Sequence, residues 1–199
     1  MVATLIIPGL NGSAEGHWQR YWVRDHKAAT IVRQSSWAGP VLKDWLAALD
    51  VELERAGEAW LVAHSLGCVL AANLANRPAA RRVKGAFLVA PCDLERTEQL
   101  HPGAIDFGAM PTEALPFPSF VVGSRDDPYM DFAELRHYAA RWGSGLHDLG
   151  HAGHINIASG FGRWERGYRL FSAFAKQFEN QRNSHVRPRR HHVLCPAMS

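Results

Sequence analysis

The sequence has few cysteines, no long hydrophobic run and no regular ligand spacing for a metal. Cys68, Cys92 and Cys195 are an odd number without a CxxC pair, which argues against a disulfide framework or a structural zinc site. No apolar stretch approaches the roughly 18 residues that a membrane span needs, and no basic segment precedes the first apolar run. We therefore expect a cytoplasmic protein that uses no membrane.

The positive charge of the chain is concentrated in its last 19 residues. The formal charge is +3, but residues 181–199 contribute four arginines and no acid. The remaining residues include 18 basic and 19 acidic side chains, so nothing in them indicates nucleic-acid binding. Because residues 181–199 also lack an apolar pattern, we expect a single domain over 1–180 followed by a basic, disordered tail.

Short apolar runs alternate with longer amphipathic ones, which is typical of an α/β fold with a mainly parallel sheet. The predicted strands lie near residues 4–7, 30–33, 59–63, 84–90, 119–123 and 145–149. The predicted helices lie near residues 17–26, 41–57, 66–77, 131–143 and 163–180. Residues 91–118 break the alternation with five prolines, and this segment is a candidate lid over a site.

A polar turn follows the third predicted strand. Residues 63–67 read Ala-His-Ser-Leu-Gly, close to the G-x-S-x-G pattern in which small flanking residues expose a nucleophilic serine on a tight turn. The alternative is that Ser65 merely caps the helix that follows. Taken alone, this stretch leaves the two interpretations equally open.

Candidate partners for Ser65 follow two later strands in the chain order expected of an α/β-hydrolase, which is serine, acid, histidine. Asp126 and Asp127 come directly after the fifth strand, and His154 lies in a glycine-flanked loop after the sixth. The carboxyl ends of parallel strands share one edge of the sheet, so these groups are expected to meet. A turn for the aspartates and a surface position for the histidine are the separate alternatives.

A serine nucleophile also needs backbone N–H donors for the oxyanion that forms on the substrate. The N–H of Leu66 is one candidate because it begins a helix beside the serine. The second donor is expected in the loop after the first strand, with Leu10 preferred and Asn11 next. A plain turn is the alternative for that loop. Four side chains are candidates for the substrate pocket, with core or rim positions as the alternative for the aromatic ones: Asn11, Trp18, Trp37 and Tyr129.

His147, His151 and His154 cluster in the sequence and raise the question of a metal. Their spacing crosses a strand end and a loop, and no HExxH helix brings two imidazoles onto one face. We therefore expect no metal ligands among them.

Five stretches of the chain resemble the small serine hydrolases of the YdeN type, a family that includes retinoblastoma-binding protein nine. They are PGLNGSAEGHWQRYW, VAHSLGC, LPFPSFVVGSRDDPYM, RWGSGLHDLGHAGHIN and SGFGRWERG, within about residues 3–178. The resemblance implies an α/β-hydrolase fold, a three-layer sandwich with a reduced sheet of about six strands and a minimal lid. It also implies a triad of Ser65, Asp127 and His154. Family members often have Asn-Asp-Pro at the acid, where this chain has Asp126-Asp127-Pro128, so Asp126 stays open as a substitute.

The expected function is cleavage of small carboxylic esters or related acyl compounds through an acyl-enzyme, without a cofactor. The expected partner is a small-molecule acyl substrate. Two alternatives remain, a hydrolase-fold interaction module with little turnover and an enzyme that cleaves thioesters or amides. Nothing in the sequence decides the substrate or the oligomeric state.

Overall fold

The computed structural model describes residues 2–186 of the 199-residue chain, with the side chains of residues 2–180. Six strands form one sheet in which every neighbouring pair is parallel. The strands are β1 (Ala3–Ile7), β2 (Ala29–Ile31), β3 (Ala59–His64), β4 (Val83–Val89), β5 (Ser119–Gly123) and β6 (Gly145–Asp148). Their order across the sheet is β2-β1-β3-β4-β5-β6. All six lie within about a residue or two of the predicted ranges.

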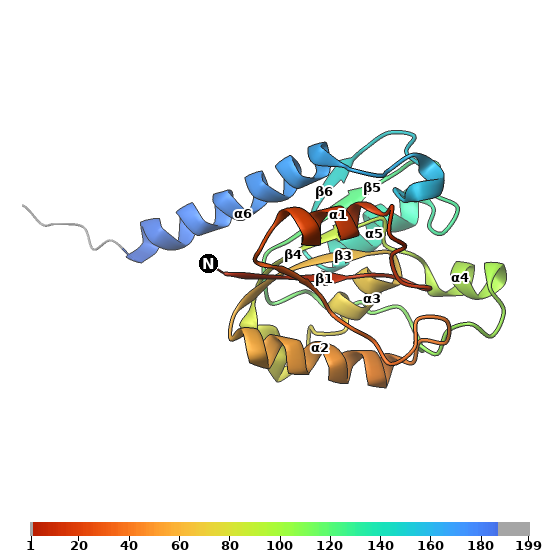
Figure 1. Cartoon of the computed structure of the whole chain (residues 1–199), viewed down its shortest axis with the longest axis horizontal. Helices are drawn as coiled ribbons and strands as arrows, with labels where there is room; N and C mark the ends of the chain where they lie inside the picture. Colours follow the sequence, from red (N-terminus) through yellow and green to blue (C-terminus); the bar gives the residue numbers. More distant parts are fainter. Residues whose placement is uncertain (1, 187–199) are drawn as a thin grey trace, which may run out of the picture.

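Helices cover both faces of the sheet (Figure 1). The α-helices are α1 (Trp18–Asp25), α2 (Leu42–Ala56), α3 (Leu66–Ala72), α4 (Leu94–Leu100), α5 (Phe132–Arg141) and α6 (Glu165–Val186). Two short 3-10 helices complete the chain, η1 (Pro78–Arg82) and η2 (Ile157–Ser159). α3 ends earlier than predicted, and α6 continues six residues beyond its predicted end at 180 into the expected tail. Residues 187–199 of that tail lie outside the described residues.

The period-two alternation of strand side chains builds two cores, one on each face. In β3, Leu61 and Ala63 face the core shared with α2, α3 and α5, whereas Trp60 and Val62 face the core shared with α1 and α6. Both faces of β3 are buried, which explains why its sequence is an uninterrupted apolar run up to His64. The arrangement is a three-layer α/β sandwich with a six-stranded parallel sheet, as the family resemblance implied.

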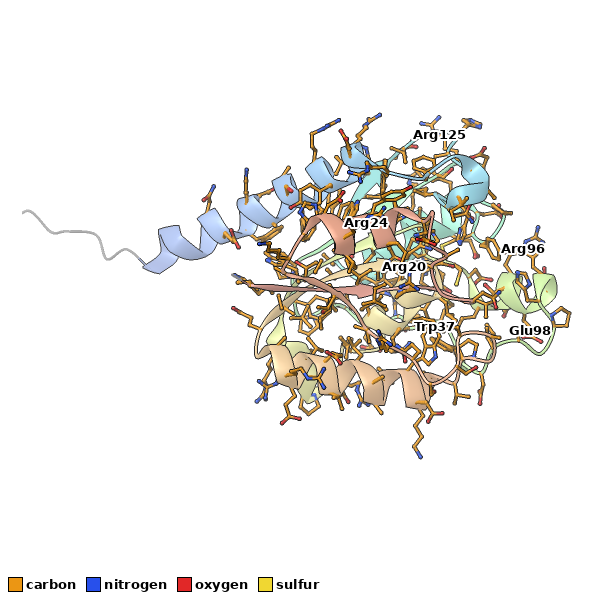
Figure 2. The ribbon with its side chains drawn as sticks, viewed as in Figure 1. Arg20, Arg24, Trp37, Arg96, Glu98 and Arg125 are labelled. Atoms are coloured by element: carbon orange, nitrogen blue, oxygen red, sulfur yellow. The ribbon has the colours of Figure 1, made fainter. Side chains whose placement is uncertain are left out.

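The proline-rich segment 91–118 differs from the prediction because it contains a helix, α4. Asp93 caps that helix by accepting a hydrogen bond from the Arg96 backbone N–H at 2.6 Å. The rest of the segment is joined to the body of the protein, for example by the Leu42 N–H donating to Asp106 and the Leu115 N–H donating to Trp142. The segment therefore forms a fixed wall rather than a separate cap. Figure 2 shows Arg96 and Glu98 on α4, at the end of the molecule opposite the projecting part of α6.

No helix within the described residues is both long and apolar enough to cross a membrane.

Two glycines let the loop after β1 lie directly against the turn after β3. A Cβ atom on Gly67 would lie 2.4 Å from the carbonyl oxygen of Ile7 and 2.7 Å from that of Pro8. A Cβ on Gly9 would lie 2.8 Å from the Cβ of Ser65. All three distances are too short for a real Cβ atom, so this contact requires glycine on each side.

Gly67→Ala is expected to destabilise the protein because the added methyl meets backbone that cannot turn aside. A cost of about 2–3 kcal/mol would lower the Tm by roughly 5–10 °C, measured by calorimetry. Gly39→Ala is the matched control, since its Cβ would meet nothing closer than Ser36 Oγ at 3.7 Å. Equal Tm values for the two variants would contradict the close contact.

Candidate active site

Ser65 lies on the turn between β3 and α3, at the carboxyl edge of the sheet. Its backbone adopts φ 54° and ψ −124°, a conformation that non-glycine residues rarely adopt. Its side chain makes no capping hydrogen bond to α3. The structure therefore does not support the interpretation of Ser65 as a helix cap. The hydroxyl is instead within hydrogen-bond distance of a side chain 89 residues later in the sequence.

That residue is His154, which bonds to both other groups of the predicted triad. Its Nε2 lies 2.9 Å from Ser65 Oγ. Its Nδ1 lies 2.9 Å from both carboxylate oxygens of Asp127. The side chains of His154 and Asp127 are only 7% and 4% exposed, so this hydrogen-bonded contact is shielded from water. The three predicted side chains are thus brought together in the expected order.

Asp126 points away from this histidine ring and holds the loop that carries it. Its Oδ1 accepts hydrogen bonds from the backbone N–H groups of Ala152 and Gly153, at 2.9 and 2.8 Å, and from Ser124 Oγ at 2.6 Å. These donors, first of all the Ser124 hydroxyl, lower the pKa of Asp126. The two aspartates therefore have different contacts. Asp127 contacts the imidazole, and Asp126 links its loop to the histidine loop.

Two further hydrogen bonds fix the same loop. His64 Nε2 lies 2.9 Å from the carbonyl oxygen of His154. The Trp18 indole N–H donates to the carbonyl of Ile155 at 3.0 Å. Trp18 is fully buried and does not line the cleft, so its prediction as a pocket residue is wrong. It acts instead as a support behind the histidine loop.

Leu66 and Leu10 are the predicted oxyanion donors. Within residues 2–186, neither of their N–H groups donates to a backbone or side-chain acceptor, and Leu66 N lies 3.2 Å from where a Cβ of Gly9 would be. The alternative donor, the N–H of Asn11, is already bonded to the carbonyl of Trp37 at 2.8 Å. The structure therefore leaves Leu10, rather than Asn11, available in this loop.

A cleft of about 320 Å³ opens beside Ser65. Its lining includes six of the predicted site residues: Leu10, Asn11, Ser65, Leu66, Tyr129 and His154. Seven further lining residues with larger or polar side chains were not among those predicted: His17, His64, Cys92, Thr97, His101, Asn156 and Ile157. Two features of the sequence could have indicated some of them. One is the His17-Trp18 pair at the start of α1, and the other is the position of His64 directly before Ser65.

Trp37 does not line this cleft, so its prediction as a pocket residue is also wrong. Figure 2 shows Trp37 on the α2 side of the sheet, where its ring lies 5.6 Å from that of Trp45. Its ring lies under Gly12 and its carbonyl accepts from Asn11. Trp37 therefore packs against the loop after β1 and accepts a hydrogen bond from it.

The histidines predicted not to form a metal site are separated in the structure. His147 stacks on Phe120, and His151 lies 3.9 Å from Asp126, while His154 bonds to Asp127. Within residues 2–186, no three His, Cys, Asp or Glu side chains are grouped so that they could hold a metal.

Comparison with protein families gives this geometry its context. The family described as serine hydrolase matches residues 4–173. This chain belongs to the serine hydrolase family. Among solved structures, a protein described as a YdeN-like hydrolase from Pectobacterium atrosepticum is 31% identical, with a TM-score of 0.77, covering 88% of this chain and 91% of that chain. The ydeN gene product of B. subtilis is 21% identical, with a TM-score of 0.69, over 87% and 98%.

Esterase 2 of Thermogutta terrifontis shares the fold at 15% identity, with a TM-score of 0.64, over 88% of this chain and 82% of that chain. None of the curated proteins matches. This serine hydrolase is thus a small hydrolase of the YdeN type with an α/β-hydrolase fold.

Burial sets the ionisation of the other polar groups around Ser65. It lowers the pKa of His17 to about 4 and that of His64 well below its ordinary value, with the nearby His154 adding to both effects. Burial also raises the pKa of the Cys92 thiol to about 11. At neutral pH this serine hydrolase therefore presents a neutral His17, a neutral His64 and a protonated, weakly nucleophilic Cys92 thiol in the cleft.

Asp127→Asn is expected to lower kcat/KM for an activated ester by as much as about 10⁴-fold, because an amide favours the wrong tautomer of His154. Asp126→Asn is the matched control. Its amide oxygen can still accept the two loop N–H bonds, so a loss of about tenfold or less is expected. Greater damage in folded Asp126→Asn would reverse the assignment of the two aspartates.

Stability is expected to fall as the pH drops from about 6.5 to about 4. The unfolded chain protonates His17 near pH 6.5, whereas the folded chain resists until about 4, so acid favours unfolding. His17→Asn removes this site, and calorimetry across the range should show about one proton fewer taken up on unfolding at pH 5. The Tm difference at pH 8 measures the effect of the substitution on packing alone. An unchanged pH dependence would show that His17 is not held neutral by the fold.

Proposed function

We propose that this serine hydrolase cleaves small carboxylic esters or related acyl compounds through an acyl-enzyme on Ser65. One observation carries the proposal. His154 contacts Ser65 Oγ through one ring nitrogen and Asp127 through the other, each at 2.9 Å. That pairing gives a serine hydroxyl a base to take its proton and gives the base a fixed tautomer.

In the proposed reaction, Ser65 Oγ attacks the ester carbonyl while His154 Nε2 takes the hydroxyl proton. Asp127 stabilises the imidazolium that forms. The N–H groups of Leu66 and Leu10 bind the oxyanion. Collapse breaks the bond to the alcohol, which leaves with the proton from His154, and a water activated by the same imidazole then releases the acid. The chain supplies every group for these steps, so the reaction requires no cofactor.

The cleft favours small, uncharged substrates. Its volume is about 320 Å³, and its lining residues, all in the described part of the chain, include no Asp, Glu, Lys or Arg. A substrate with a net charge would lose its water shell there without gaining an opposite charge. Thioesters and amides of similar size fit the same space, so a panel of matched acyl esters, thioesters and amides is the test of bond preference.

Ser65→Ala is expected to fold normally and lose on the order of 10³-fold or more in ester hydrolysis, because unactivated water replaces a positioned nucleophile. Labelling by a fluorophosphonate should also disappear. Ser35→Ala, at an exposed position, is the matched control and should keep both.

Two outcomes would reject parts of the proposal. Full hydrolysis by Ser65→Ala would exclude Ser65 as the nucleophile. Labelling of the wild type without turnover of any ester, thioester or amide would favour the alternative of an interaction module that retains a reactive serine.

A further inference from the structure

His17 is a buried histidine in the cleft for which the steps proposed above give no role. It is the N-cap residue of α1, is only 4% exposed, and lines the same cleft as Ser65. Its ring lies 4.9 Å from that of His64, which in turn lies 4.9 Å from that of His154. The three imidazoles therefore form a row of adjacent rings in the cleft lining, in which His64 contacts both His17 and His154.

The cap hydrogen bond determines which nitrogen of His17 carries the proton. Nδ1 accepts from the backbone N–H of Gln19 at 3.3 Å. Because that nitrogen is an acceptor and the ring is neutral, the proton is on Nε2. Among residues 2–180, no side chain or backbone group pairs with His17 Nε2, and this atom is not sealed inside the protein. His17 therefore offers a neutral N–H donor to the cleft.

His64 does not offer the same donor, because its Nε2 is already paired with the carbonyl of His154. Among the three histidines, His17 is thus the one whose Nε2 has no hydrogen-bond partner within the described residues. An unpaired N–H group that is largely buried costs stability, so a partner from the substrate would offset that cost.

The position of the row indicates which part of the substrate meets His17. In serine-hydrolase chemistry the catalytic histidine returns its proton to the leaving alcohol, so the alcohol lies on the side of that histidine. From His154 the cleft lining continues through the adjacent rings of His64 and His17, which makes His17 a candidate contact for the alcohol. The oxyanion donors Leu66 and Leu10 belong instead to the turn and the facing loop.

We propose that His17 is a substrate-binding residue whose Nε2–H donates a hydrogen bond to an oxygen in the alcohol part of the ester. The favoured substrates are then esters of alcohols that carry an ether or hydroxyl oxygen near the ester bond, such as glycol and glycerol esters. The inference rests on the proposed ester hydrolysis at Ser65. A neutral donor suits such uncharged oxygens because neither partner carries a charge that burial would penalise.

The test compares two esters that differ at one atom, butyl acetate and 2-methoxyethyl acetate, in which an ether oxygen replaces a methylene. The measured quantity is the ratio of their kcat/KM values, compared between variants, because the two alcohols also differ in leaving-group ability. A neutral hydrogen bond predicts that wild type favours 2-methoxyethyl acetate by about three- to tenfold more than a variant without the donor.

Three variants separate binding from helix capping. His17→Asn keeps a cap acceptor at the position of Nδ1 but has no donor at the position of Nε2, so the preference should fall by about three- to tenfold. His17→Gln places an amide N–H near the position of Nε2 and should retain part of the preference, even if loss of the cap lowers its Tm. His26→Asn, at the other end of α1 and away from the cleft, should match wild type.

An unchanged ratio in folded His17→Asn would overturn the inference. Equal losses on both esters would also overturn it, because they would show a structural role alone. Failure of the proposed function gives a different result, since the wild type would then hydrolyse neither ester, whether or not Ser65 reacts with a fluorophosphonate.

Discussion

The contact between the loop after β1 and the turn after β3 is the constraint on which the rest of the site depends. Gly9 lies against Ser65, and Gly67 lies against the end of β1, at distances that leave no room for a Cβ atom. Because of this contact, the free N–H of Leu10 and that of Leu66 come from two segments pressed together at one edge of the sheet. A bulkier residue at either glycine would separate the donors and displace the nucleophile together.

The histidine loop is held by groups from separate parts of the fold. The Asp126 carboxylate anchors the two residues before His154, His64 and Trp18 bind the carbonyls of the histidine and its successor, and Ser159 Oγ accepts from the His154 N–H. Asp126 follows β5, and His64 ends β3. Trp18 begins α1, and Ser159 lies in η2. Each bond fixes backbone rather than the imidazole itself, so the ring remains free for Ser65 and Asp127.

The sequence predicts the fold and the three reacting side chains well, because strands with buried faces are readable as apolar runs and the order of Ser65, Asp127 and His154 places each after a strand. It predicts the surroundings poorly. The pattern of residues 17–26 indicates a buried helix face, but it does not show whether Trp18 meets the cleft or, as the structure has it, a loop 137 residues away. α4 was missed because prolines flank a short helix whose apolar pattern is weak.

Non-glycine residues with a strained backbone conformation lie at the carboxyl edge of the sheet. Four non-glycine residues in the described chain have positive φ, namely Asn11, Ser65, Ala90 and Ile155, and all lie in turns after strands or in the loop of His154. Each such conformation costs about 1–3 kcal/mol, and for a β-branched residue such as Ile155 the cost is expected at the upper end. The buried cores on both faces of the sheet offset this cost. Relaxing Asn11, Ser65 or Ile155 would stabilise the backbone locally but would turn the Leu10 donor, the nucleophile or the base away from the cleft, so stability and site geometry oppose each other there.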